Sequence, residues 1–249
     1  MLASVKKFRS AAVLQELRHN HREIRHSSNP DIDPARSVDN DDLTPDHGGV
    51  SPYEYYKARL GELYICDPRR TDINTAFGWI VTLPQSITAP EEEQRFFLTV
   101  ADFLIERYGP ENCVSVTIHR DEGGQPHLHY IGIPAVANNM RNEDHPQAEK
   151  LSCKEVINRQ ELRVFHPDLQ KYLDEHGINA KVLTGVTKGK NRTVEELKRE
   201  TLADLRAEVD RLQEIERKYN ELLQERSMKH ERSRWDRSSD RDRERGRFG

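Results

Sequence analysis

The sequence predicts an α+β domain in which an antiparallel sheet carries helices on one face. Strand-forming residues flank a loop with Gly123, Gly124 and Pro126 in residues 113–134, CVSVTIHRDEGGQPHLHYIGIP, a pattern typical of a β-hairpin. Residues 77–84 (FGWIVTLP) have the composition of another strand. Between these strands, residues 90–109 show helical apolar spacing, with acidic residues in the first turn and a glycine at the end.

The remaining elements of this domain precede the strand at 77–84. Residues 1–9 fit a short edge strand, and Ser10 is a candidate N-cap for the helix predicted at 10–17. That helix leads into RHNHREIRH at 18–26, which two polar loops follow. Pro52 then stands at the N1 position of a tyrosine-rich helix. Adjacent strands of such a chain are expected to pair antiparallel.

Residues 150–177 follow the hairpin and are expected to form two helices. Pro167 marks the predicted break between them, because proline interrupts helical hydrogen bonding. Gly177 marks the predicted end of the second helix.

The chain is expected to divide into a domain at 1–190, a long helix at 191–228 and a disordered Arg/Asp/Ser-rich tail at 229–249. Thr193 and Glu196 form a capping box that starts this helix. Apolar residues then follow heptad spacing at Leu202, Leu205, Val209, Leu212, Tyr219 and Leu223. The seam contains one glutamate, so it suits either a short coiled coil that could join two copies or a helix lying on the core.

Composition limits the function only loosely. The 249 residues are 35% hydrophobic and 33% charged, and the net charge is −4. This charge does not exclude DNA binding, because a local basic stretch such as 6–36 decides phosphate contacts. Isolated cysteines at Cys66, Cys113 and Cys153 fit a reducing compartment and argue against a disulfide framework. No signal peptide or membrane span is expected, and we predict a cytoplasmic protein.

Three histidines surround the hairpin loop. Side chains alternate along a strand, so His127 and His129 share one face, and His119 ends the partner strand within reach of them. Converging imidazoles form a divalent-metal site with open positions for water or substrate. The alternative is that the pair lies unliganded on the wet face of the sheet. The third histidine and the nearby Asp121 and Glu122 favour a site.

The stretch HRDEGGQPHLHYIGIP resembles the metal motif of the MobV (Pre/Mob, plasmid recombination enzyme) relaxases, within the HUH endonuclease superfamily. The matching positions are His119, Asp121, Glu122, Pro126, His127 and His129. His19-Asn20 followed by Arg22 resembles the family's N-terminal motif, and Arg70 resembles an arginine that precedes an equivalent strand. The resemblance covers about residues 15 to 205.

This resemblance implies an enzyme that nicks one DNA strand at a plasmid transfer origin, stays attached to the 5′ end and later rejoins it. It also implies an antiparallel sheet with flanking helices and a Mn²⁺ or Mg²⁺ ion, although imidazole ligands would equally suit Zn²⁺. Plasmid DNA, single-stranded near the nick, is the implied partner. The conjugation machinery and a second copy of the chain are further candidates.

The resemblance also assigns roles. The three motif histidines would hold the metal that polarises the scissile phosphate. Glu122 would orient a ligand or accept a proton, and Arg22 and Arg70 would clamp phosphate oxygens. Basic residues expected to contact DNA are Arg18, Arg25, Lys188, Lys190 and Arg192.

Two residues compete as nucleophile. His19 matches the position of the histidine associated with the MobV group, and Tyr53 resembles a tyrosine at a similar place in the family. We favour His19, because its surroundings are basic and match the motif. His21 stands where the family has an acidic residue, so His19 lacks its expected carboxylate neighbour.

The sequence is also compatible with two other functions. A rolling-circle replication initiator or a transposase of the same superfamily would use the same motif chemistry. The chain has no G-x-x-x-x-G-K-[ST] loop, which argues against a fused helicase. The other alternative is a non-catalytic DNA-binding protein whose histidines hold a structural metal.

Overall fold

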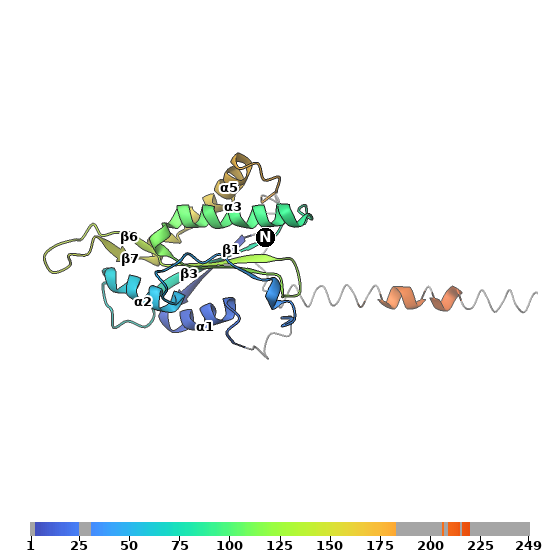
Figure 1. Ribbon diagram of the computed structural model, residues 1–249, viewed down its shortest axis with the longest axis horizontal. Coiled ribbons are helices and arrows are strands. Elements are labelled where there is room, and N and C mark those ends of the chain that lie inside the picture. The colour runs from blue at the N-terminus through green and yellow to red at the C-terminus, as the bar shows by residue number, and fades with distance from the viewer. Residues whose placement is uncertain (1–2, 25–30, 183–205, 207–208, 215, 220–249) are drawn as a thin grey trace, which may run out of the picture. The chain divides into compact units, whose positions relative to one another are not determined.

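The computed structural model describes residues 3–24, 31–182, 206, 209–214 and 216–219. The chain divides into a compact unit, Met1–Val186, and a second unit, Thr187–Gly249 (Figure 1). The described residues of the second unit are helical. Most of the long helix at 191–228 and all of the tail at 229–249 lie outside the described residues, so those boundaries stay predictions.

The compact unit is built on one antiparallel sheet of five strands, in the order β1-β3-β5-β4-β2. The strands are β1 (Ala3–Arg9), β2 (Asp41–Asp42), β3 (Asn74–Thr82), β4 (Cys113–His119) and β5 (His127–Gly132). A small second sheet pairs β6 (Ala135–Ala137) with β7 (Glu149–Leu151). The predicted α+β class, the edge strand at the N-terminus and the hairpin are confirmed.

Helices cover both faces of the sheet, so the expectation that they lie on one face was wrong (Figure 1). Helices α1 (Ser10–Asn20) and α2 (Pro52–Glu62) lie on one side, and α3 (Pro90–Tyr108) and α5 (Arg159–Glu175) lie on the other. The physical reason is that the strands are apolar on both faces. Trp79 and Val81 pack into the core beneath α3 and α5, whereas Ala76 and Ile131 pack toward α1 and α2.

Pro167 does not break the helix in which it stands, contrary to expectation. It lies inside α5, and the break comes earlier, between α4 (Cys153–Val156) and α5. The Asn158 side chain starts α5 by accepting a hydrogen bond of 2.9 Å from the Glu161 backbone nitrogen. The buried residues Phe165, Leu169 and Leu173 form one apolar stripe along α5. This packing on the core holds the helix together despite the missing backbone donor.

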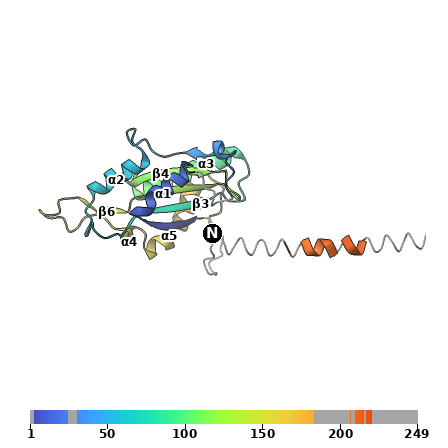
Figure 2. The ribbon, with the colours of Figure 1, turned by 90° about the horizontal axis from the view of Figure 1, so that it is seen from below.

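The path of the N-terminal segment decides where the site forms. Strand β1 runs from Ala3, opposite Val81, to Arg9, opposite Asn74. Helix α1 then returns along the sheet, as the view from the α1 side shows (Figure 2). Its last turn therefore comes back to the end of the sheet where His127 pairs with Thr82. No helix among the described residues is long and apolar enough to cross a membrane.

Candidate active site and metal centre

The three hairpin histidines meet on the sheet face that α1 covers. His119 pairs directly with His127 across β4 and β5, and His129 lies two residues further on the same face. One ring nitrogen of each lies within 4.8 Å of the others. The intervening Leu128 and the following Tyr130 point into the core on the opposite face. Strand parity and register therefore suffice to bring these imidazoles together.

Hydrogen bonds select the tautomers of two of these rings. His119 Nε2 donates to the Asn20 carbonyl at 2.8 Å, and His127 Nδ1 donates to the Gln125 carbonyl at 3.2 Å. A carbonyl only accepts, so the lone pairs remain on His119 Nδ1 and His127 Nε2. His119 Nδ1 and His129 Nε2 are buried, and neither has a hydrogen-bond partner among the described residues. Buried nitrogens with available lone pairs fit a metal ion.

Burial favours the neutral form of two of these rings, His127 and His129. Desolvation lowers the pKa of His127 below its usual range. Desolvation and the neighbouring histidines hold the pKa of His129 well below that range. Neutral imidazole is the form that binds a metal, so this donor set suits a divalent cation at neutral pH.

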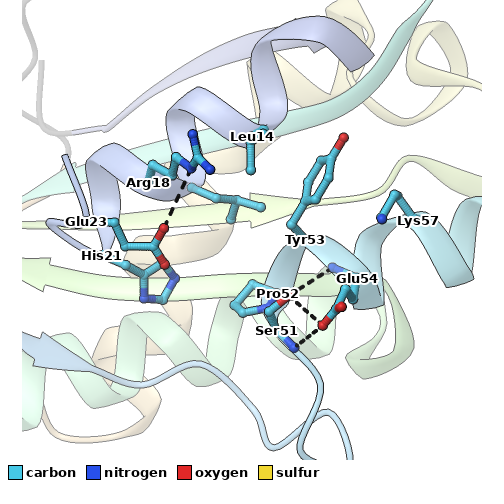
Figure 3. A pocket seen from close by; sticks show the side chains of 10 residues that line it. Leu14, Arg18, His21, Glu23, Ser51, Pro52, Tyr53, Glu54 and Lys57 are labelled. Carbon is cyan, nitrogen blue, oxygen red and sulfur yellow. Dashed lines mark hydrogen bonds and ion pairs between the residues drawn. The ribbon is translucent and has the colours of Figure 1, made fainter.

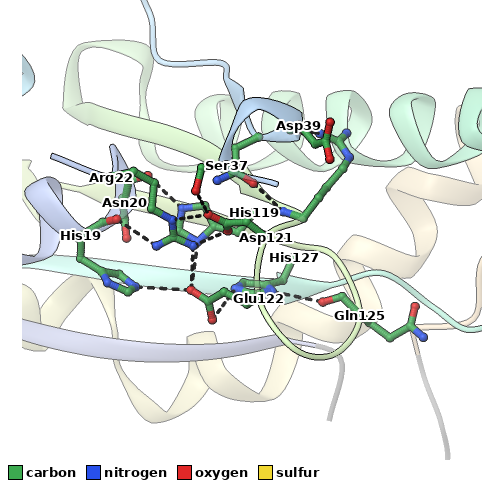
Figure 4. A network of polar contacts seen from close by, with 12 residues as sticks. His19, Asn20, Arg22, Ser37, Asp39, His119, Asp121, Glu122, Gln125 and His127 are labelled. Carbon is green, nitrogen blue, oxygen red and sulfur yellow. Dashed lines mark hydrogen bonds and ion pairs between the residues drawn. The ribbon is translucent and has the colours of Figure 1, made fainter. Parts of the chain in front are cut away.

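The Glu122 carboxylate lies among the histidines (Figure 4). Its Oε1 atom is 3.6 Å from His119 Nδ1 and 3.7 Å from His19 Nε2, and its Oε2 atom is 3.8 Å from His127 Nε2. Burial raises the pKa of Glu122, but its polar contacts, including the hydrogen bond from Arg22, outweigh burial and bring the pKa to about 2. His19, His119 and Glu122 form a second potential metal-binding group that shares His119 with the first.

Arg22 is engaged by protein groups, and its expected role as a phosphate clamp stays a prediction. Its guanidinium donates to both carboxylate oxygens of Asp121, at 2.8 and 2.6 Å, and to Glu122 Oε1 at 2.8 Å. It also donates to the His19 carbonyl at 3.0 Å. Asp121 is completely buried and accepts a further hydrogen bond of 2.6 Å from Ser37 Oγ. A buried carboxylate needs a paired charge, so Arg22 ties α1 to the hairpin loop.

The end of α1 has an unusual backbone. Glu23 N donates to Arg18 O at 2.9 Å and Arg22 N donates to His19 O at 3.2 Å, which is a Schellman motif. Arg22 occupies its left-handed position with φ 54°, where glycine is the usual residue. This conformation costs about 1 kcal/mol for a residue with a Cβ. The ion pair with Asp121 offsets that cost and aims the guanidinium into the loop.

His21 anchors the same turn from its other side. Its Nδ1 lies 3.1 Å from Asp42 Oδ2, and its Nε2 lies 2.9 Å from Ser115 Oγ. The arrangement has the order of an Asp–His–Ser triad, but Ser115 is completely buried, so no substrate reaches its hydroxyl. Asp42 from β2 thus gives His21 a carboxylate partner, whereas His19 has the Glu122 carboxylate at 3.7 Å. Asp42, Ser115 and Ser37 were missed in the sequence, because they lie far along the chain from residues 19–22.

The structure does not bring every expected residue to the histidines. Arg70 pairs with Asp72, at 2.8 and 2.6 Å, on the exposed surface before β3. Strand β3 starts at Asn74, and Ile80 of this strand pairs with His129. The extended chain between Asn74 and Ile80 spans about 20 Å. Arg70 thus lies near the far end of the sheet from the three imidazoles.

Tyr53 lies in the first turn of α2, in a pocket between α1 and α2 (Figure 3). Its ring contacts Tyr56 and Lys57 of the same helix. Arg18 lines the same pocket, with its Nε 3.8 Å from Glu23. The other residues expected at DNA lie outside the described residues: Arg25, Lys188, Lys190 and Arg192.

Comparison with known proteins places this site in a family. The family model for plasmid recombination enzymes (Mob_Pre) matches residues 1–199. The chain belongs to this family. Plasmid recombination enzymes from Streptococcus agalactiae and a Bacillus species are 29% and 31% identical to it. Each alignment covers 82% of this chain but only 40% and 46% of the relative. The chain thus spans less than half the length of these plasmid recombination enzymes.

Solved structures give the same family and confirm the fold. The chain is similar to the relaxase domain of MobM, a MOBV (Mob_Pre) protein, crystallised with Mn and plasmid pMV158 oriT DNA. The TM-score is 0.65 at 27% identity, covering 80% of this chain and 97% of that domain. A second crystal structure of that complex gives a TM-score of 0.64. The residues matched by the family model, 1–199, include the sheet, the hairpin and the end of α1.

Proposed function

We propose that this chain is a plasmid mobilisation relaxase. It would nick one DNA strand at a transfer origin and rejoin it through a covalent 5′-phosphate intermediate. The observation that carries the proposal is the meeting of His19 and Glu122 with the three hairpin imidazoles at one spot. The family and the oriT complex of the similar MobM domain support the same substrate.

In this proposal His119, His127 and His129 hold a divalent ion, and the Mn-bound MobM structures favour Mn²⁺. Such an ion, when bound, would polarise the non-bridging oxygens of the scissile phosphate. Asn20 and Gln125 fix two of the rings through their carbonyls, so the lone pairs are oriented before DNA arrives.

His19 is the proposed nucleophile. Its ring centroid lies 5.9 Å from that of His119 and 6.2 Å from that of His129. An imidazole nitrogen attacks phosphorus, a P–N bond forms, and the P–O3′ bond breaks to release the 3′ oxygen, which takes up a proton. Glu122 Oε1, 3.7 Å from His19 Nε2, stabilises the positive charge that builds on the ring. The ring proton passes to solvent, which supplies the proton for the 3′ oxygen. The P–N bond retains the energy of the phosphodiester, so rejoining needs no external energy source.

The purified chain is expected to convert a supercoiled plasmid that carries its native origin into the open circular form in the presence of Mn²⁺. EDTA removes the ion and should abolish the product, and a plasmid without the origin is the matched control. The nicked strand should carry protein at its 5′ end. Binding without any relaxed product would favour the non-catalytic alternative. Cleavage at a replication origin alone would favour the initiator.

Metal binding is testable without DNA. Ligand binding at 100 times Kd adds about 2.7 kcal/mol to stability, which raises Tm by roughly 5–10 °C in a domain of this size. We expect Mn²⁺ to produce such a rise in the wild type and none in His129→Ala. His176→Ala changes a histidine at the end of α5 and is the control. An equal rise in His129→Ala would contradict the ligand assignment.

Two finer expectations stay predictions. The cytoplasmic location rests on the sequence alone. The homodimer depends on the heptad seam at 202–223, of which the described Val209, Leu212 and Tyr219 are exposed.

A further inference from the structure

We propose that the pocket between α1 and α2 binds a DNA nucleotide next to the scissile phosphate and that its base packs on Tyr53. The pocket has a volume of about 270 Å³. The inference rests on the proposed relaxase function and adds to it a binding subsite separate from the metal centre.

Two helix faces line this pocket (Figure 3). The α1 side contributes residues at positions i, i+3, i+4 and i+7, which share one face of a helix. These residues are Leu14, Leu17, Arg18 and His21. The α2 side contributes Tyr53 and Lys57, one turn apart, together with Pro52. The helices therefore present an apolar and aromatic interior with cations beside it.

That combination matches the chemistry of a nucleotide in single-stranded DNA. Leu14, Pro52 and the Tyr53 ring offer the flat apolar surface on which a base packs. Arg18 and Lys57 are exposed cations that can reach the adjoining phosphates, and Lys57 Nζ lies 5.0 Å from the Tyr53 ring centroid. Single-stranded DNA sites use this pairing of aromatic platforms and cations.

Two carboxylates also line the pocket, and both have partners. Glu54 accepts hydrogen bonds from Ser51, at 3.1 Å from its backbone nitrogen and 2.9 Å from its hydroxyl, within the capping box of α2. Glu23 lies 3.8 Å from Arg18 on the exposed rim. A phosphate can replace Glu23 as the partner of Arg18, because an exposed ion pair contributes little stability.

The position of the pocket favours DNA over a small molecule or a peptide. Arg18 precedes His19 directly, and His21 is held by Asp42 and Ser115 two residues later. His19 thus belongs to the same helix end as two pocket residues. Both the pocket helices and the hairpin histidines lie on one face of the sheet. A strand whose phosphate reaches His19 has this pocket beside it for the neighbouring base.

The experiment measures binding of the full chain to a fluorescein-labelled thymidine homopolymer by anisotropy, with EDTA present so that no cleavage occurs. Tyr53→Leu should weaken binding by roughly 5- to 150-fold, the range for loss of one base–aromatic stack, and Tyr53→Phe should restore it. Lys57→Gln should lower the salt dependence of log affinity by about 0.7. Tyr64→Leu, in a tyrosine that contacts His145, and Lys171→Gln, on α5, are the controls.

A second variant and a cross-linking experiment distinguish loss of the pocket from misfolding of the Tyr53→Leu variant. Leu14→Trp fills the pocket while leaving Tyr53 in place, and it should weaken binding as Tyr53→Leu does. DNA containing 5-iodouracil should photo-cross-link to Tyr53, as mapped by mass spectrometry. Unchanged affinity for DNA in both variants, with no cross-link in α2, would overturn the proposal that this pocket binds a nucleotide. The variants could bind DNA more weakly while the wild-type chain never nicks its origin plasmid. That result would support the nucleotide pocket and overturn only the relaxase proposal.

Discussion

His19→Ala is expected to abolish the covalent protein–DNA adduct and to lower nicking by at least about 10⁴-fold, the scale at which removal of a nucleophile acts. The reason is geometric. Of the two candidates, His19 has its Nε2 3.7 Å from the Glu122 carboxylate and its ring centroid 5.9 Å from His119. Tyr53 lies instead in the pocket between α1 and α2.

The measurement is mass spectrometry of the adduct formed with a single-stranded oligonucleotide that spans the nick site. The adduct should map to His19, and Tyr53→Phe should still form it, because that change removes only the hydroxyl group. Mn²⁺-induced stabilisation of His19→Ala should show that its three hairpin histidines still bind metal. An adduct on Tyr53 or His21, or nicking that survives in His19→Ala, would reverse the assignment.

Asp121→Asn is expected to destabilise the compact unit by about 3–5 kcal/mol, because it leaves a buried guanidinium without its main counter-charge. In a domain of this size that loss lowers Tm by roughly 6–20 °C. The side chains of Arg22 and Asp121 are only 13% and 0% exposed. The same change frees Arg22 from its left-handed turn, so the position of His19 should also loosen.

Asp72→Asn is the matched control, because Arg70 and Asp72 form the same two-pronged contact at the same distances of 2.8 and 2.6 Å. Their side chains are 58% and 57% exposed, so solvent screens the pair. Removing such a pair costs about 0–1 kcal/mol. Thermal unfolding of the two variants side by side would measure the difference. Equal losses of stability would show that the Arg22–Asp121 pair is not a structural anchor.

Much of the candidate site follows from local periodicity. Strand alternation placed His127 and His129 on one face, and hairpin pairing placed His119 opposite His127. Helix ends followed local signals as well, as at Pro52 in α2 and at Gly109 after α3. These features need only neighbouring residues and the geometry of one hairpin. For that reason a single sequence predicts them.

The tertiary structure decided the contacts between segments that lie far apart in the sequence. Residues 19–22 each contact the hairpin, roughly one hundred positions away, and the return path of α1 sets this register. Arg22 and Arg70 are of the same residue type but differ in surroundings: Arg22 pairs with the buried Asp121 and Arg70 with the exposed Asp72. Burial, not residue type, decides which arginine is an anchor. By itself, then, the sequence determined the three imidazoles of the candidate metal centre. The fold decided how His19 reaches them, because the position of His19 depends on loop closure and on the packing of α1 rather than on side-chain alternation along one strand.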